Sequence, residues 1–128
     1  MTALIDTHAL LWFVMDDPRL GAEARRCMRS GDNELLLSIG SCWELAVKCA
    51  LGKISIEKPF GQFLWPQLRD NDIRLLPIAE EHLNLLAGLE QHHRDPFDRL
   101  LVAQALAERI PLISGDAALD AYGVLRMW

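Results

Sequence analysis

Four acidic residues lie at or near the ends of short apolar segments in this 128-residue chain, and together they could bind metal ions. Asp6 directly follows the apolar stretch TALI, and Asp116 comes two residues after LIS. Glu44 lies one to two turns into a helix-forming segment after LLLS, and Asp98 lies in the first turn of another. Carboxylates that converge repel each other unless cations bind them or their pKa values rise. The pattern therefore indicates divalent-cation chemistry if the fold brings the four acids together.

A fifth acid, Asp95, complicates the assignment because it lies three positions before Asp98 in the stretch HRDPFDR. Proline is favoured at the first position of a helix, and aspartate is favoured at the cap that precedes it. Asp95 and Pro96 fit these two positions, which makes Asp98 the third residue of the helix. We therefore predict that Asp95 caps the helix and that Asp98 serves the chemistry.

Each acid also has a purely structural interpretation. Glu44 could close a capping box with Ser41, although Ser38 is an equally good helix start and would carry Glu44 deeper into the helix. Asp98 could stabilise the helix dipole, and Asp116 could cap a short helix. The acid after the first apolar segment is the hardest to explain structurally, because burying an unpaired carboxylate costs free energy. We consider it less expected that all four acids have purely structural roles than that they share one site.

Histidines and cysteines give weaker signals. His8, His82, His92 and His93 are candidates for a general base or a metal ligand, although single histidines more often have structural roles or lie exposed. The adjacent pair His92 and His93 is expected in a loop, where it could at most contact a substrate phosphate. The three cysteines form no C-x-x-C pattern and no paired Cys/His spacing, so we expect neither disulfides nor a zinc site.

Composition favours an ordinary globular protein, with 51% hydrophobic and 24% charged residues. The net charge of −5 disfavours broad adhesion to nucleic acid, but only weakly if several carboxylates bind cations. The longest apolar run, ALLWFVM, is too short to span a bilayer, and no basic stretch precedes it as in a signal peptide. We therefore expect a cytoplasmic protein that does not associate with membranes.

Short apolar segments alternate with helix-forming segments along one domain, residues 1–128. This alternation predicts an α/β fold in which helices cover a short parallel sheet, with ligands bound beyond the carboxyl ends of the strands. Strands are expected at 2–6, 34–38, 73–77, 110–114 and 124–128. Helices are expected at 8–15, 22–30, 38–52, 60–68 with a break near Pro66, 79–89 and 97–109, with a further short turn after Asp116.

Several other function classes lack their motifs. The chain has no phosphate-binding G-x-x-x-x-G-K-[ST] or G-x-G-x-x-G loop and no G-x-S-x-G elbow. An aspartyl phosphatase would need D-x-D after the first strand, where this chain has His8. A non-enzymatic, magnesium-binding receiver-like module would need an aspartate at the end of a middle strand, and neither KISIEK nor IRLLP supplies one.

The segments LIDTHALLW, LLLSIGSCWELAVKCALGKI, HHRDPFDRLLVAQALAE and LISGD together resemble the PIN-domain ribonucleases. More narrowly, they are similar to the VapC toxins of toxin–antitoxin pairs, collinearly over nearly the whole chain. The resemblance implies a three-layer α/β/α fold and a Mg²⁺- or Mn²⁺-dependent endoribonuclease, usually a homodimer silenced by a VapB-like antitoxin. It assigns the metal ligands and catalytic acids to Asp6, Glu44, Asp98 and Asp116.

The resemblance also places Thr7 and Ser114 at hydroxyl positions near the site, where they could contact substrate. Arg94, Arg99 and Lys48 are plausible contacts for substrate phosphates, although Lys48 is equally placed to pair with the acid four residues before it. The resemblance further implies that cleavage of RNA leaves 5′-phosphate and 3′-hydroxyl ends. The acids alone do not distinguish RNA from DNA, so a DNA nuclease of the same fold is the alternative.

An excess of large apolar side chains predicts a groove for an antitoxin helix or a dimer interface, with core packing as the alternative. These residues are Trp12, Phe13, Phe60, Phe63, Leu64 and Trp65.

Overall fold

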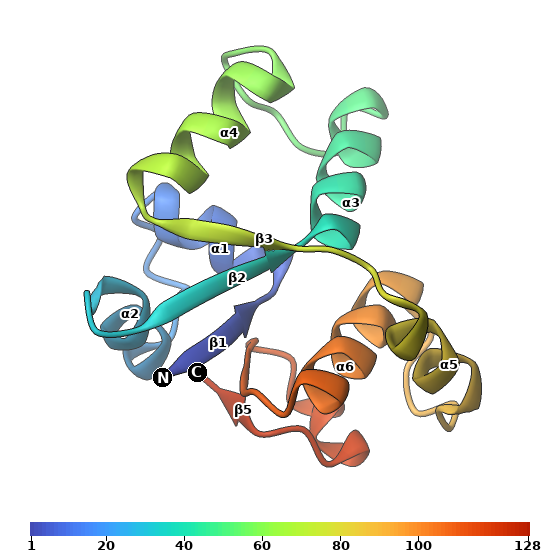
Figure 1. The fold of residues 1–128 in the computed structure, drawn as a ribbon. Helices are drawn as coiled ribbons and strands as arrows, with labels where there is room; N and C mark the ends of the chain where they lie inside the picture. Colours follow the sequence, from blue (N-terminus) through green and yellow to red (C-terminus); the bar gives the residue numbers. More distant parts are fainter.

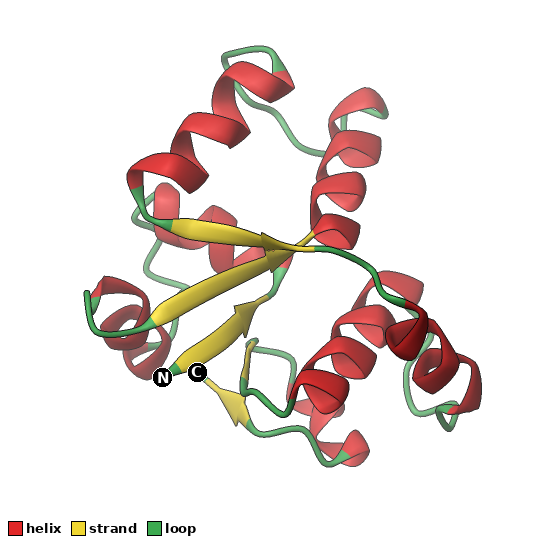
Figure 2. Cartoon of the chain, in the orientation of Figure 1, coloured by secondary structure: helices red, strands yellow, loops and turns green.

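A five-stranded sheet, parallel throughout, forms the centre of the protein in the order β3-β2-β1-β4-β5. It is seen in a computed structural model that describes residues 1–128 (Figures 1 and 2). The strands are β1 (Thr2–Ile5), β2 (Glu34–Ser38), β3 (Ile73–Leu76), β4 (Leu112–Ile113) and β5 (Arg126–Met127). The predicted α/β fold with a short parallel sheet is therefore confirmed.

Helices cover both faces of this sheet and complete three layers (Figure 1). The helices are α1 (Thr7–Val14), α2 (Ala22–Arg29), α3 (Ile39–Ala50), α4 (Phe60–Asp70), α5 (Glu80–Gly88), α6 (Pro96–Glu108) and the 3₁₀-helix η1 (Ala117–Tyr122). One core lies between the sheet and α1, α2, α3 and α4, and a smaller core lies between the sheet, α6 and η1. None of these helices is both long enough and apolar enough to cross a bilayer.

The strands are continuous apolar runs because both of their faces are buried. In β1, Ala3 and Ile5 face the larger core while Leu4 faces the smaller one, and all three side chains are fully buried. Burying one leucine or isoleucine side chain stabilises a fold by roughly 1.5–3 kcal/mol. The central strand is thus fixed from both sides, and with it the position of the residue that follows it.

The predicted break near Pro66 is wrong, because α4 continues through this residue to Asp70. Proline removes one backbone donor and clashes with the carbonyl four residues earlier, which disfavours a helix interior. Leu64 and Leu68 lie on either side of Pro66 in α4, and both are buried in the larger core. Tertiary packing of both turns therefore outweighs the local cost of the proline.

The winding order creates a crevice beside the central strand. From β1 the chain proceeds outward to β2 and β3, and it then returns to β4 on the other side of β1. The connections after β1 and β4 consequently leave toward different helices. Such a switch point is where open parallel sheets bind ligands. Residues just after β1 and β4 are therefore placed at the mouth of this crevice.

Candidate metal centre

A cleft of about 390 Å³ opens at the carboxyl ends of β1 and β4. Three of the four acids singled out from the sequence, Asp6, Asp98 and Asp116, line it together. The remaining lining residues are His8, Trp12, Arg19, Gly115 and Trp128. The cleft thus has an acidic side and a side that is aromatic and basic.

Asp6 occupies the first position after β1 and serves as the N-cap of α1. Its Oδ1 accepts a hydrogen bond from the backbone N–H of Ala9 at 2.7 Å, and its residue surface is only 6% exposed. Burial raises the pKa of this carboxyl above its usual value, although a hydrogen bond with the Ser114 side chain and the Ala9 N–H oppose the rise. These two hydrogen bonds and the charge of His8 lower the pKa less than burial raises it, and no salt bridge neutralises the carboxylate.

Asp95 and Asp98 have the different roles expected from HRDPFDR. Asp95 is the N-cap of α6, and its Oδ1 accepts from the N–H groups of Phe97 at 2.8 Å and Asp98 at 3.3 Å. The predicted cap is therefore confirmed. The Asp98 side chain instead lines the cleft, where burial, and then the neighbouring charge of Asp95, raise its pKa to about 7.

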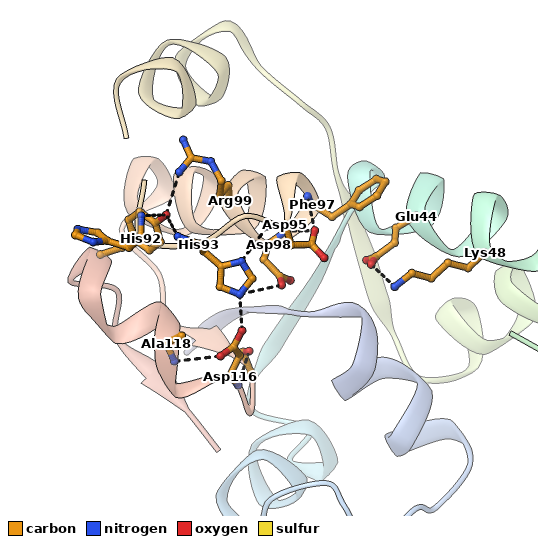
Figure 3. A network of polar contacts seen from close by, with 12 residues as sticks. Glu44, Lys48, His92, His93, Asp95, Phe97, Asp98, Arg99, Asp116 and Ala118 are labelled. Atoms are coloured by element: carbon orange, nitrogen blue, oxygen red, sulfur yellow. Dashed lines mark hydrogen bonds and ion pairs between the residues drawn. The ribbon is translucent and has the colours of Figure 1, made fainter. Parts of the chain in front are cut away.

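Asp116 belongs to the loop after β4 and lies beside both Asp98 and a histidine (Figure 3). Its Oδ1 accepts from Ala118 N at 3.1 Å, so Asp116 also caps η1. Its Oδ2 lies 2.7 Å from Nε2 of His93, and the same nitrogen is 3.7 Å from Oδ2 of Asp98. One ligand atom from each of these three residues falls within 4.8 Å of the others, which is close enough to surround a single ion.

Glu44 lies behind the cleft and is not part of its lining. Because Ser38 is the N-cap of α3, Glu44 is the sixth residue of that helix, and the capping-box alternative with Ser41 does not apply. One carboxylate oxygen of Glu44 accepts from Thr7 Oγ1 at 2.5 Å and the other accepts from Lys48 Nζ at 2.7 Å. Its negative charge nevertheless affects the cleft, because it helps to raise the pKa values of two of the acids there, Asp6 and Asp98.

The residues expected to contact substrate have different positions. Thr7 and Ser114 are buried, and their hydroxyls bond within the protein, to Glu44 and to the backbone N–H of Asp116. Arg94 is exposed in the loop before α6 and stays a predicted contact. For Arg99 the expectation needs correction, because its guanidinium is buried and donates to the carbonyl oxygens of residues 89 and 90 and to a tyrosine hydroxyl. It stabilises the loop and does not face the cleft.

The four histidines do not share one role. His8 lines the cleft, whereas the buried His82 accepts a backbone hydrogen bond from Ala79 at the start of α5 and is structural. His92 is exposed in the loop. The sequence pattern gave His93 at most a phosphate contact, yet its ring lies among the acids. The only sequence signal for this was its position two residues before the helix cap.

The aromatic and basic side of the cleft was also not foreseen as part of the site. Arg19 lies over the ring of Trp12, 4.8 Å from its centroid, and Trp128 meets Trp12 edge-on at 5.7 Å. A Cβ at Gly115 would come within 2.8 Å of the Trp128 indole, so glycine lets this ring pack against the loop that carries Asp116. The glycine of the SGD segment is therefore required for packing against Trp128, in addition to being part of the motif.

The donor set of the cleft fits a hard divalent cation. Its acidic side offers carboxylate oxygens, which Mg²⁺ and Mn²⁺ prefer, and no thiolate, since all three cysteines are free thiols outside the cleft lining. Burial raises the pKa values of Asp6 and Asp98 more than the opposing charges of His8 and His93 lower them. A bound cation would supply further positive charge.

Solved structures with the same architecture include VapBC and FitAB proteins. A chain of VapBC2 from Rickettsia felis bound to a promoter DNA fragment superposes with a TM-score of 0.75 at 13% identity, covering 100% of both chains. VapBC-1 from nontypeable Haemophilus influenzae gives a TM-score of 0.66 at 16% identity, covering 98% of this chain and 96% of that one. FitAcB from Neisseria gonorrhoeae gives 0.64 at 16% identity, covering 97% and 95%. These likenesses show a shared fold.

Sequence comparison gives the family directly. No curated protein matches this chain at a significant level. The profile of the PIN domain, however, matches residues 3–125, which include β2, β3, β4, all of β1 except Thr2, and every acid discussed above. This protein therefore belongs to the PIN domain family.

Proposed function

We propose that this protein is a Mg²⁺- or Mn²⁺-dependent endoribonuclease and the toxin of a VapBC-type toxin–antitoxin pair. The observation that carries the proposal is the convergence of Asp6, Asp98 and Asp116 in one open cleft at the switch point of the sheet. Membership of the PIN family argues against the receiver-like module considered above. A PIN nuclease that acts on DNA is the remaining alternative.

The chain's own residues divide the work of phosphodiester hydrolysis. Asp6, Asp98 and Asp116 would hold the cation, which when bound activates water and neutralises charge on the phosphate. Glu44 keeps its position through Thr7 and Lys48, and each of its oxygens retains a lone pair. We propose that Glu44 accepts a hydrogen bond from a water in the site and does not ligate the cation directly.

Cleavage should require a divalent cation. Purified protein incubated with single-stranded RNA is expected to cut it with added Mg²⁺ or Mn²⁺ and to lose that activity in EDTA, because the three carboxylates alone repel a phosphate. Gel analysis of end-labelled RNA measures the rate, and restoring the cation should restore it. A DNA oligonucleotide of the same sequence is the matched substrate control. Cleavage that persists in EDTA would contradict the metal mechanism, and preferential cleavage of DNA would favour the alternative.

For partner binding, we propose a groove between α4 and residues 55–58 as the seat of a VapB-like antitoxin segment. Of the six apolar residues expected to form such a surface, Leu64 belongs entirely to the core, and Trp65 is 42% exposed. Phe63 packs partly on the core and also lines the groove, which has a volume of about 510 Å³. Met15 lines the same groove and is 51% exposed. That several structures of this fold are toxin–antitoxin complexes supports the proposal.

A charge placed in this groove should weaken antitoxin binding. Met15→Glu is expected to reduce co-purification with the protein encoded by the adjacent reading frame, because the substitution replaces an exposed apolar side chain of the groove with a carboxylate. Leu83→Glu is the matched control, since Leu83 is 50% exposed but lies on α5, on the opposite side of the sheet. Sedimentation of the protein alone tests the expected homodimer. A monomer at high concentration that is not inhibited by the adjacent gene product would contradict the toxin proposal.

A further inference from the structure

The His93 ring joins two acids that come from separate segments of the chain. It belongs to the loop between α5 and α6, yet its Nε2 lies 2.7 Å from Oδ2 of Asp116, in the loop after β4. The same nitrogen is 3.7 Å from Oδ2 of Asp98, in the first turn of α6. Figure 3 shows the imidazole lying between these two carboxylates. Its side chain is only 19% exposed, so the surrounding protein restricts its orientation.

The other ring nitrogen determines what Nε2 can do. The backbone N–H of Asp95 donates to Nδ1 of His93 at 3.1 Å, so Nδ1 must present a lone pair. In a neutral imidazole the second nitrogen then carries the hydrogen. Nε2 of His93 is therefore a donor toward Asp116, and a nitrogen that carries a hydrogen is not available to ligate a metal. Although its distances alone would suit a ligand, its hydrogen bonds assign it another role.

The backbone of this loop is fixed by the same region of the protein that carries Asp116. The N–H groups of His92 and His93 donate to the hydroxyl of Tyr122 at 3.1 and 3.0 Å. Arg99 Nη1 donates to the same hydroxyl at 3.0 Å. Tyr122 is the last residue of η1, the 3₁₀-helix that Asp116 caps. The imidazole and the carboxylate it contacts are thus held in one connected set of hydrogen bonds.

We propose that His93 is a positioning residue for the metal centre. Its Nε2–H orients the Asp116 carboxylate, and its Nδ1 holds the Asp95 backbone at the start of α6, which sets the distance between Asp116 and Asp98. His93 is the only side chain that hydrogen-bonds to Oδ2 of Asp116, while Oδ1 accepts from the backbone N–H of Ala118 in the helix cap. The inference deepens the proposed nuclease function and rests on it.

Two substitutions separate the two hydrogen bonds of the ring. In His93→Asn the side-chain oxygen lies near the former Nδ1 and can still accept from Asp95 N, but the side chain is too short to reach Asp116. In His93→Gln the longer amide can donate to Asp116 in place of Nε2. His92→Asn is the matched control, because the exposed His92 ring pairs with Glu90 and packs edge-on against Tyr122 but contacts none of the acids of the cleft. Circular dichroism and melting curves establish that each variant is folded.

Mn²⁺ binding to the metal-free protein, followed by the electron paramagnetic resonance signal of free Mn²⁺, is the main measurement. Loss of a partner that orients a metal ligand typically lowers metal affinity about 10–100-fold. We expect a loss of this size in His93→Asn, a clearly smaller loss in His93→Gln, and wild-type affinity in His92→Asn. The Mn²⁺ concentration that half-saturates RNA cleavage should follow the same order, with much of the His93→Asn activity recovered at high Mn²⁺.

Other results would overturn the inference. Wild-type affinity in His93→Asn would show that the ring positions nothing, and equal losses in Asn and Gln would show that donation to Asp116 is not what matters. Because His8 also lines the cleft, nitrogen coupling to Mn²⁺ in the electron spin-echo spectrum of the wild-type protein would make His93 a direct ligand only if the histidine coupling disappears in His93→Gln, and that result would overturn the inference. If the wild-type protein binds no Mn²⁺ at all, the metal-dependent function fails first. That failure of the proposed function can be distinguished from a failure of the His93 inference, because it is seen in the wild-type protein without any variant.

Discussion

Asp98→Asn is expected to abolish RNA cleavage at ordinary Mg²⁺ concentrations, whereas Asp95→Asn should keep most of it. Asparagine preserves the size of Asp98 and its place in the first turn of α6 but removes a negative charge from the cleft. Losing one anionic ligand is worth several kcal/mol of transition-state stabilisation, and about 4 kcal/mol corresponds to a rate loss of roughly a thousandfold. The fold should be unaffected, because Asp98 makes no side-chain hydrogen bond that holds α6.

The contrast with Asp95 follows from the cap geometry. The Asp95 side chain accepts two backbone hydrogen bonds at the start of α6, and an asparagine oxygen can accept the same bonds. Asp95→Ala cannot, so it should lower the free energy of unfolding by about 1 kcal/mol and reduce the rate modestly. Asp95→Asn should also lower the raised pKa of Asp98, because the charge of Asp95 is the second-largest cause of that rise.

Four variants, Asp95 and Asp98 each changed to Asn and Ala, are enough for this comparison. Each is assayed for cleavage across a Mg²⁺ titration and for thermal unfolding. An inactive Asp95→Asn with an active Asp98→Asn would reverse the assignment. If both Asn variants were inactive with normal melting temperatures, the two acids would share the cation, and the cap would be only part of the role of Asp95.

The metal-free protein should lose stability as the pH rises from about 4 to about 7. Burial raises the pKa of Asp98 from 3.8 to about 7 and raises that of Asp6 as well, so the folded state favours their protonated forms. A raised carboxyl pKa contributes stability that is complete below the unfolded pKa and is lost as the pH passes the folded pKa. The melting temperature in EDTA is therefore expected to fall across this window, and Mn²⁺ should restore it at pH 8 by binding the ionised acids.

Asp6→Asn should remove part of this pH dependence and all of the cleavage. Asparagine can still accept from Ala9 N to cap α1, but it has no charge to bury. In EDTA its melting temperature should exceed that of the wild-type protein at pH 8, and the difference should be smaller at pH 4, because the raised pKa of Asp6 favours its protonated form as the pH falls. Differential scanning fluorimetry at both pH values, with and without Mn²⁺, measures the effect, and Mn²⁺ should raise the melting temperature of this variant little.

Asp120→Asn provides a control of opposite sign. Asp120 is paired with Arg126, which lowers the pKa of its carboxyl, so removing that charge should lower the melting temperature slightly at pH 8. If Asp6→Asn also lowered the melting temperature at pH 8, the ionised carboxylate of Asp6 would stabilise the fold. It would then not be a metal-binding charge whose burial destabilises the metal-free protein.

Features that depend on neighbouring residues could be predicted from the sequence alone. The alternation of apolar and amphipathic segments predicted the parallel α/β fold, because burial on both faces of a strand requires continuous apolar runs. The D-P pair predicted the α6 cap, because a cap bonds N–H groups two and three residues away. For Glu44, the sequence left Ser38 and Ser41 open as helix starts, and only the structure selected Ser38.

Features that depend on contacts between distant segments were decided by the tertiary structure. The Thr7 hydroxyl is 37 residues from the Glu44 carboxylate it bonds, and His93 is 23 residues from Asp116. The same packing turned Arg99 inward to the loop and carried α4 through Pro66. The sequence specifies that acidic residues follow the strands, because this depends only on the order of neighbouring residues along the chain. Which of them face one another depends on how loops pack across the sheet, where hydrogen-bond geometry and burial are set by residues far apart in the chain.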